Sequence, residues 1–200
     1  MKRQFVASLL GGLLLANGVA HADTAPVKLR GTIEAVNPNG FDLATRAGGK
    51  VHVTLFPKTH YSALSQGSVA DIKPNSFIGS AALPQADGTL KALEVTVFPE
   101  EMRGTGEGQF PWDTAPSSSM TNGVVGTLAG GDGHTMVVKY GAGEAKIVIS
   151  DATPVVKLET ADSAAVVAGA KAFVVAMAGA DGAFTALFVA VGKDGVTPPM

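Results

Sequence analysis

The chain carries one stretch of sequence twice. Residues 86–97 read ADGTLKALEVTV and residues 180–191 read ADGAFTALFVAV, so that seven of the twelve positions are identical at a separation of 94 residues. Upstream, Gly31-Thr32 recurs as Gly126-Thr127 at a separation of 95 residues. This nearly constant separation indicates a tandem duplication. Such a repeat constrains the fold strongly, because each copy is expected to form the same supersecondary unit.

Each copy consists of short segments in which apolar and polar residues alternate. Alternation with a period of two is typical of strands that bury one face, and glycine, proline and asparagine turns separate the segments. In the first copy the predicted strands are 29–36, 41–45, 51–55, 77–83 and 90–98. In the second copy they are 124–128, 135–140, 145–150, 172–178 and 184–191.

The spacing of these strands predicts an all-β fold. Five strands with one long connection, between the third and the fourth, are the layout of an OB-like barrel. We therefore expect two tandem five-stranded OB-like barrels, the first at 23–98 and the second, with a short C-terminal tail, at 122–200. The long connection of the first copy, 56–72, is expected to hold no more than a helical turn at 69–72. A pair of β-sandwich sheets is the alternative architecture.

A segment rich in glycine and proline, 99–121, connects the two predicted barrels. Its composition predicts no regular structure. It nevertheless contains Met102, Phe110 and Trp112, the one tryptophan of the chain, and flexible linkers seldom carry such side chains. We expect Phe110 and Trp112 to hold this segment against a barrel or between the two.

The N-terminus has the pattern of a secretory signal peptide. Lys2 and Arg3 precede an apolar stretch, 5–20, and Ala20-His21-Ala22 matches the small-residue site at which signal peptidase cuts. Residues 1–22 are therefore predicted to be removed, which leaves 13 basic residues against 17 acidic ones. After residue 22 no apolar run is long enough to span a membrane. These features predict an exported protein of the bacterial periplasm.

Composition excludes several classes of function. The 200 residues are 46% hydrophobic and 16% charged, which argues against a wholly disordered chain. The formal net charge of −2 gives no basic surface for a nucleic-acid partner. The chain has no cysteine, so disulfides, thiolate metal sites and cysteine nucleophiles are excluded.

Four segments of the sequence resemble those of a known group of proteins. They are LRGTIEAV, the run from ADIKPNSFIGSAALPQ through ADGTLKALEVTVFPEEMRGTGEG, PWD, and the tail VGKDGVTPPM. In these strings the chain resembles a group of bacterial exported proteins of unknown function with tandem OB-like units. Members of that group often carry the label of a metal ABC transporter permease. Because a permease needs several apolar spans, the resemblance implies at most a soluble companion of a transporter.

The sequence offers little that indicates catalysis or a bound cofactor. It contains no G-x-S-x-G motif, no phosphate-binding loop followed by lysine, and no histidine pair at zinc-site spacing. We therefore expect no enzymatic activity and no cofactor. A soft metal such as Cu(I) could use a thioether and an imidazole, and His60 with Met102 is the pair that we name for it. An exposed loop histidine and a methionine that fills a packing gap explain the same two residues without a metal.

A binding or scaffold role remains as the expected function, with a small ligand or an envelope protein as the partner. OB-like barrels bind ligands on one sheet face and its adjoining loops. The second copy has Pro154 and Val155 where the first has His60 and Tyr61, so we expect the first copy to bind. A periplasmic metal-handling accessory protein is the alternative function. The candidate ligand-binding residues are Arg30, His52, Lys58, His60, Tyr61 and Trp112.

Overall fold

The structure is a computed structural model of the chain, and it describes residues 25–129, 134–141, 143–179 and 182–200. The predicted signal peptide, 1–22, and residues 130–133, which lie between the predicted strands 124–128 and 135–140, are outside the described residues. In the described parts the fold is all-β: fourteen strands and three short 3₁₀ helices. No helix in these parts has the length and apolarity that crossing a membrane requires.

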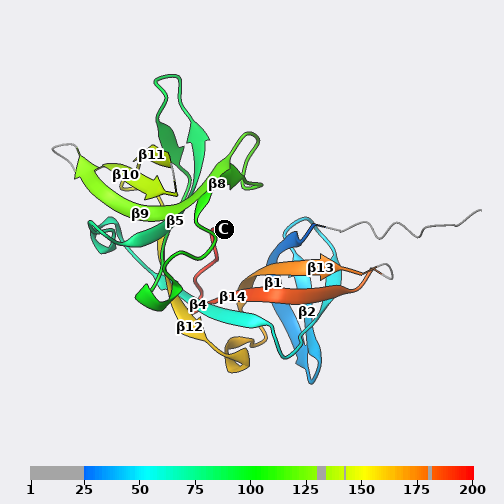
Figure 1. Cartoon of the computed structure of the whole chain (residues 1–200). Coiled ribbons are helices and arrows are strands. Elements are labelled where there is room, and N and C mark those ends of the chain that lie inside the picture. The colour runs from blue at the N-terminus through cyan, green and yellow to red at the C-terminus, as the bar shows by residue number, and fades with distance from the viewer. Residues whose placement is uncertain (1–24, 130–133, 142, 180–181) are drawn as a thin grey trace, which may run out of the picture.

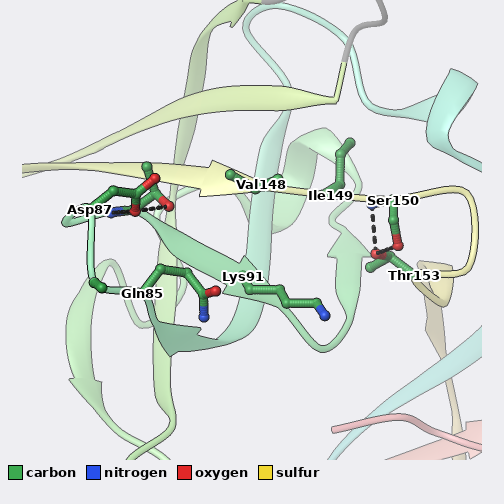
Figure 2. A pocket seen from close by; sticks show the side chains of 9 residues that line it. Gln85, Asp87, Lys91, Val148, Ile149, Ser150 and Thr153 are labelled. Carbon is green, nitrogen blue, oxygen red and sulfur yellow. Dashed lines mark hydrogen bonds between the residues drawn. The ribbon is translucent and has the colours of Figure 1, made fainter.

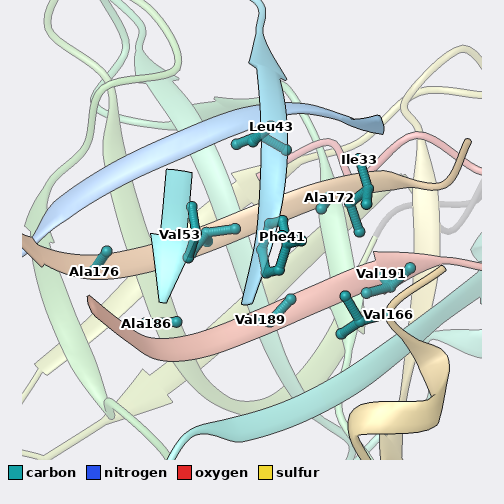
Figure 3. Close-up of a cluster of buried hydrophobic side chains, with 11 residues drawn as sticks. Ile33, Phe41, Leu43, Val53, Val166, Ala172, Ala176, Ala186, Val189 and Val191 are labelled. Atoms are coloured by element: carbon teal, nitrogen blue, oxygen red, sulfur yellow. The ribbon is translucent and has the colours of Figure 1, made fainter. Parts of the chain in front are cut away.

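Five strands pair in a closed ring, which we call the first ring (Figure 1). Pairing is antiparallel around it except between β3 (Lys50–Thr54) and β14 (Phe184–Gly192), which are parallel. Its interior is filled by large apolar side chains from every strand, among them Ile33, Phe41 and Val189, each with no exposed surface (Figure 3). In order, its strands are β1 (Val27–Asn37), β2 (Gly40–Thr45), β3 (Lys50–Thr54), β14 (Phe184–Gly192) and β13 (Lys171–Ala178).

Five other strands pair in a second closed ring, whose strands follow one another in the equivalent order. This second ring encloses its own apolar cluster, which includes Ile78, Met136 and Ile147. Here the parallel pair is β6 with β11, and β5 with β9 closes the ring. In order, its strands are β9 (Ser119–Ala129), β10 (Thr135–Tyr140), β11 (Gly143–Val148), β6 (Leu90–Ala92) and β5 (Phe77–Pro84). A further short strand, β7 (Val95–Val97), continues β6 and pairs with β5.

Each ring takes strands from both halves of the chain. The first ring joins β1–β3 to β13 and β14, and the second joins β9–β11 to β5 and β6. The expected division into barrels at 23–98 and 122–200 therefore differs from the strand pairing. The physical reason lies in the long connections: because each contains a strand, it carries the chain from one ring to the other before the last two strands begin.

The two strands within these connections join the rings. They are β4 (His60–Gln66) and β12 (Val155–Ala161), which pair with each other antiparallel. Leu64 lies opposite Leu158 in that pair, and the two residues are 94 positions apart. β4 also pairs in parallel with β14 of the first ring. β12 pairs in parallel with β7, which itself pairs with β5 of the second ring. The pair of β4 and β12 therefore connects the two rings.

Several short elements differ from the sequence-based expectation. The connection 56–72 contains β4 as well as the expected turn, η1 (Val69–Asp71). The strand expected at 90–98 is interrupted at Leu93, where β6 ends before β7 begins. The connecting segment 99–121 is not wholly irregular, because it contains η2 (Glu100–Met102), β8 (Gly108–Pro111) and the start of β9. β8 pairs with β9, and this pairing provides hydrogen-bond partners for backbone N–H and C=O groups of the segment. The glycine- and proline-rich composition did not predict this pairing.

The strand register also corrects one detail of the internal repeat. Ile33 lies opposite Leu43 on β2, and Val125 lies opposite Val138 on β10. On this register Gly31 corresponds to Gly123 rather than to Gly126. A side chain at either glycine would collide with the neighbouring strand, since a Cβ atom would lie 2.1 Å from the Ala44 oxygen or 2.3 Å from the Lys139 oxygen. Five residues of sequence separate β9 from β10, whereas two separate β1 from β2, and this difference of three shifts the alignment of the residues before it.

Candidate functional site

An apolar layer lies between the two rings, and we call it the central layer. Residues of β4, β12, β13 and β14 form its buried part, and the connecting segment and the C-terminal tail cover it. Figure 1 shows the C-terminus in this position, between the two lobes of the molecule. The side chains in the layer are Leu64, Phe98, Met102, Trp112, Val156, Leu158, Phe173, Val175, Phe188, Ala190, Val196 and Met200.

A cavity of about 700 Å³ opens beside this layer. Four other hollows of the molecule are smaller, with volumes of about 420 to 520 Å³. Its wall is mostly aliphatic, aromatic and thioether groups, from five separate parts of the chain. These are β4, the segment that follows β7, β12, β14 and the C-terminal tail, which contributes one residue. The lining residues are His60, Tyr61, Ser62, Phe98, Glu101, Met102, Thr105, Leu158, Thr160, Leu187, Phe188 and Met200.

The polar groups of this cavity lie mainly at its rim and are partly bonded to one another. The Thr160 hydroxyl donates to the Glu101 carboxylate over 2.9 Å. The buried Ser62 hydroxyl lies 4.0 Å from the Met102 sulfur, as a weak hydrogen bond to a thioether. His60 is exposed, at the start of β4. The cavity therefore offers an apolar interior with an imidazole and a carboxylate near its opening.

Trp112 fastens the connecting segment to the first ring. Its ring centroid lies 6.3 Å from that of Phe173 on β13 and 5.9 Å from that of Phe110 on β8. The Lys28 ammonium lies 4.2 Å above the indole, in the range of a cation–π contact. Trp112 thus lies between the rings, in line with the expectation that aromatic side chains hold this segment in place.

The C-terminal tail is held by two arginines of the first ring. Arg46 donates to the Pro198 oxygen over 2.8 Å, and Arg30 donates to the main-chain oxygen of Met200. Arg30 also forms a two-point ion pair with Asp113, at 2.8 and 3.1 Å, which holds the pKa of that carboxyl below its usual value. Met200 is 8% exposed. The tail and the connecting segment therefore meet at Arg30.

The structure brings some of the sequence-predicted site residues together and separates others. His60, Tyr61 and Met102 line the same cavity. Arg30 and Trp112 lie at the same interface, where each packs on Phe173.

Two of the candidate residues lie elsewhere. His52 is exposed on β3, as its place between two valines predicted, and its Nδ1 lies 2.8 Å from an Asp42 oxygen. Lys58 is exposed in the turn before β4, and neither residue lines the cavity. The six candidate ligand-binding residues therefore do not form a single site.

Sequence reasoning missed the second half's contribution to this site. Leu158, Leu187 and Phe188 line the cavity from β12 and β14, and Met200 reaches it from the tail. Because each ring joins strands of both halves, a search for a site within one half could not find this combination. The apolar residue at Phe188, where the first copy has Glu94, was the available signal.

A second hollow, of about 420 Å³, lies where the turn after β5 meets the end of β11 (Figure 2). Its polar groups bond locally: Asp87 accepts from the Thr89 backbone and hydroxyl at 3.0 and 2.7 Å, which lowers the pKa of Asp87. Ser150 and Thr153 bond to each other. With these groups occupied, the hollow presents few free partners for a ligand.

No group of three or more histidine, aspartate or glutamate side chains in the described parts of the chain is arranged to hold a metal ion. A metal at His60 and Met102 would need thioether ligands, and Met200 lines the same cavity. Comparison of the chain with protein-family models, with curated proteins and with solved structures finds no match.

Proposed function

We propose that the protein is an exported, non-enzymatic binding protein of the bacterial envelope. In this proposal it holds a small apolar ligand, or an apolar segment of an envelope protein, in the cavity between its two rings. The observation that carries the proposal is the lining of that cavity: Phe98, Leu158, Leu187 and Phe188 give it an apolar wall on several sides. Pockets of this size and character are typical of small-molecule sites.

The placement of the polar groups supports binding rather than catalysis. Glu101 accepts from Thr160, and Ser62 is directed to the Met102 sulfur rather than to a general base. A nucleophile needs an adjacent base within hydrogen-bond reach. The polar atoms at the rim are suited instead to orienting one end of an apolar guest.

The proposal includes an origin by tandem duplication of an OB-like unit. Three observations support it: the elements recur in the same order in the two halves, both rings have a single parallel closure, and Leu64 pairs with its own counterpart Leu158. In each ring the three meander strands are followed by the fifth and then the fourth strand, which is the order of an OB barrel. Export rests on the sequence of residues 1–22 alone.

Binding can be tested with the chain from residue 23 onward and the neutral apolar dye N-phenyl-1-naphthylamine. We expect saturable dye fluorescence, with a change in Trp112 emission because the indole belongs to the same layer. Thr160→Phe places an aromatic ring at the cavity mouth and should weaken dye binding at least tenfold. The matched control is Thr127→Phe, at an exposed threonine of β9 in the second ring. Equal dye affinity in both variants would overturn the proposed site.

A soft-metal site is a second candidate, favoured by one observation: His60, Met102 and Met200 line the same cavity. Imidazole and thioether ligands suit Cu(I). Native mass spectrometry of the protein with added Cu(I) should then show one bound ion, and Met102→Leu and His60→Ala should each abolish it. A spectrum without a bound ion at excess Cu(I) would reject this candidate and leave the apolar-ligand proposal intact.

A further inference from the structure

A carboxylic acid lies buried between the two rings, outside the cavity described above. Glu94 follows β6, and its side chain is 2% exposed. The side chains at 95 and 97 pack into the second ring, so that those at 94 and 96, on the alternate face of the strand, point toward the central layer. The Ser80 hydroxyl bonds to the Glu94 main-chain oxygen at 2.8 Å and fixes the backbone there.

The carboxyl group of Glu94 has no hydrogen-bond partner in the described parts of the chain. Both of its oxygens are buried and unbonded, as is the hydroxyl of Thr96 on the same face. Charged groups are rarely buried without a partner, because burial removes their hydration without compensation. The neutral acid is therefore the form that fits this site, and burial raises the pKa of Glu94 to about 8.

The charged groups that act on Glu94 come from the first ring. They are Arg30 on β1 and Arg46 in the turn after β2, and each opposes the effect of burial. These are the same two arginines that donate to the main-chain oxygens of Met200 and Pro198. Arg30 is shared further with Asp113. The two cations that act on the buried acid thus donate hydrogen bonds to the C-terminal tail and, in the case of Arg30, to Asp113 as well.

We propose that Glu94 is a proton-binding site between the rings, and that loss of its proton releases the C-terminal tail. The proton passes to solvent and leaves a carboxylate in the central layer. The carboxylate draws Arg46 away from the Pro198 carbonyl, since a charge-assisted bond to a carboxylate is stronger than one to a neutral carbonyl, and it competes for Arg30 with the Met200 oxygen and Asp113. Release of the tail withdraws Met200 from the central layer and from the wall of the cavity. The switch is independent of which ligand the cavity takes.

The direction of the pH dependence follows from the two states of Glu94. An unfolded glutamate titrates near 4.5, whereas the folded chain holds this proton until about pH 8. The stabilisation from this group is thus complete below the lower value, and it is lost as the pH rises toward and through the higher one. The tail is therefore bound in neutral or mildly acidic solution and free in alkaline solution.

A spin label on the tail tests the proposal in the full chain. Thr197 is exposed and the chain has no cysteine, so Thr197→Cys gives one labelling site. We expect the mobile fraction of the nitroxide signal to rise with a midpoint within about one unit of pH 8. Glu94→Gln, an uncharged mimic of the acid, should abolish that rise, whereas Glu144→Gln, at an exposed glutamate of β11, should leave it unchanged.

Two results would overturn the proposal: a label mobility that does not change with pH, or a rise that persists in Glu94→Gln. If Glu94→Gln does not fold, carbon-13 labelling of the glutamate carboxyls of the unsubstituted protein gives a second measurement. One carboxyl resonance should then titrate near pH 8 together with the label mobility. If every glutamate titrates in the acidic range, Glu94 is not the proton-binding site.

Discussion

The two rings share one strand order but present different side chains to the layer between them. Where the first ring has Phe173 and Phe188, the second has Gly79 and Glu94 at the positions 94 residues earlier. The first ring also supplies Arg30, which holds both the tail and Asp113. The comparison shows that a repeated backbone does not make a symmetric interface. One ring contributes aromatic bulk and cations, and the other contributes small residues and a buried acid.

This difference places the candidate site on one side of the molecule only. At the start of β4 the first half has His60 and Tyr61, whereas the second half has Pro154 and Val155 at the start of β12. The cavity lies on the side of His60, where Phe188 is its neighbour on β14. On the opposite side, Val155 pairs with Val95, whose N–H donates to the Pro154 oxygen over 2.9 Å, and Glu94 directly precedes Val95. The departures from the repeat therefore locate the site better than the repeat itself does.

The largest expected effect comes from cutting the chain between the halves. We expect residues 23–106 and 107–200, as separate polypeptides, to lack a stable monomeric fold, because each ring takes its last two strands from the other half. Mixing the two pieces should restore the native near-ultraviolet circular dichroism of the intact protein. A stable monomer of either piece alone would show that one half can close its own ring. The exchange of strands between the halves would then be a consequence of their covalent connection.

A second prediction concerns the aromatic side of the interface. Phe173→Ala should lower the free energy of unfolding by about 3–5 kcal/mol, because it empties a buried aromatic position against Trp112 and Arg30. Urea denaturation followed by Trp112 fluorescence measures the change. The control Val167→Ala, at a side chain that is 52% exposed, should change stability by less than about 0.5 kcal/mol. A similar small loss at Phe173 would mean that the interface contributes little to folding.

A third prediction separates two alignments of the repeat. Gly31→Ala and Gly123→Ala should each cost roughly 1–3 kcal/mol, because the added carbon meets a backbone oxygen of the next strand. Gly126→Ala should cost far less, since its nearest neighbour is the flexible end of Lys139 at 3.3 Å. Thermal unfolding of the three variants provides the comparison. If Gly126 proves as sensitive as Gly31, the sequence-based alignment describes the hairpin better than the strand register does.

The smallest expected effect is that of the ion pair between Arg30 and Asp113. Arg30 lowers the pKa of Asp113, so the pair stabilises the fold above the ordinary aspartate pKa and loses this effect as the pH falls through the lowered value. Asp113→Asn should cost about 0.5–1 kcal/mol at pH 7, because the Asp113 side chain is 48% exposed and solvent screens the pair. The variant and the unsubstituted protein should converge in stability once the pH falls below the lowered pKa of Asp113. A difference that is independent of pH would assign the loss to packing rather than to charge.

Much of the secondary structure could be predicted from alternation alone. Strands such as β2, β3 and β10 are within one residue of the expected segments, because their side chains are buried on one face and exposed or half-exposed on the other. β4 and β12 were not predicted. Their sequences, HYSALSQ and VVKLETA, lack a regular alternation, since both strands have neighbours on each edge and pack against the central layer.

The candidate site was predictable only in part. His60, Tyr61 and Met102 could be named as residue types suited to binding, and they do line one cavity. Their partners Leu158 and Leu187 are ordinary strand residues whose sequence carries no signal of a site, and the available signal was Phe188, where the first copy has Glu94. Glu94 was equally hidden, because a glutamate in an alternating strand is normally taken as solvent-facing, and here that face is covered by the other ring.

The all-β class, the recurring order of strands and most strand positions follow from the amino-acid sequence alone, because local alternation and turn residues specify them. Tertiary structure alone decided which half completes each ring, and hence where the cavity, the buried acid and the docked tail lie. The physical reason is that alternation specifies which face of a strand is buried but not which strand covers it. In this chain β4 and β12 settle that choice by pairing across the centre of the molecule.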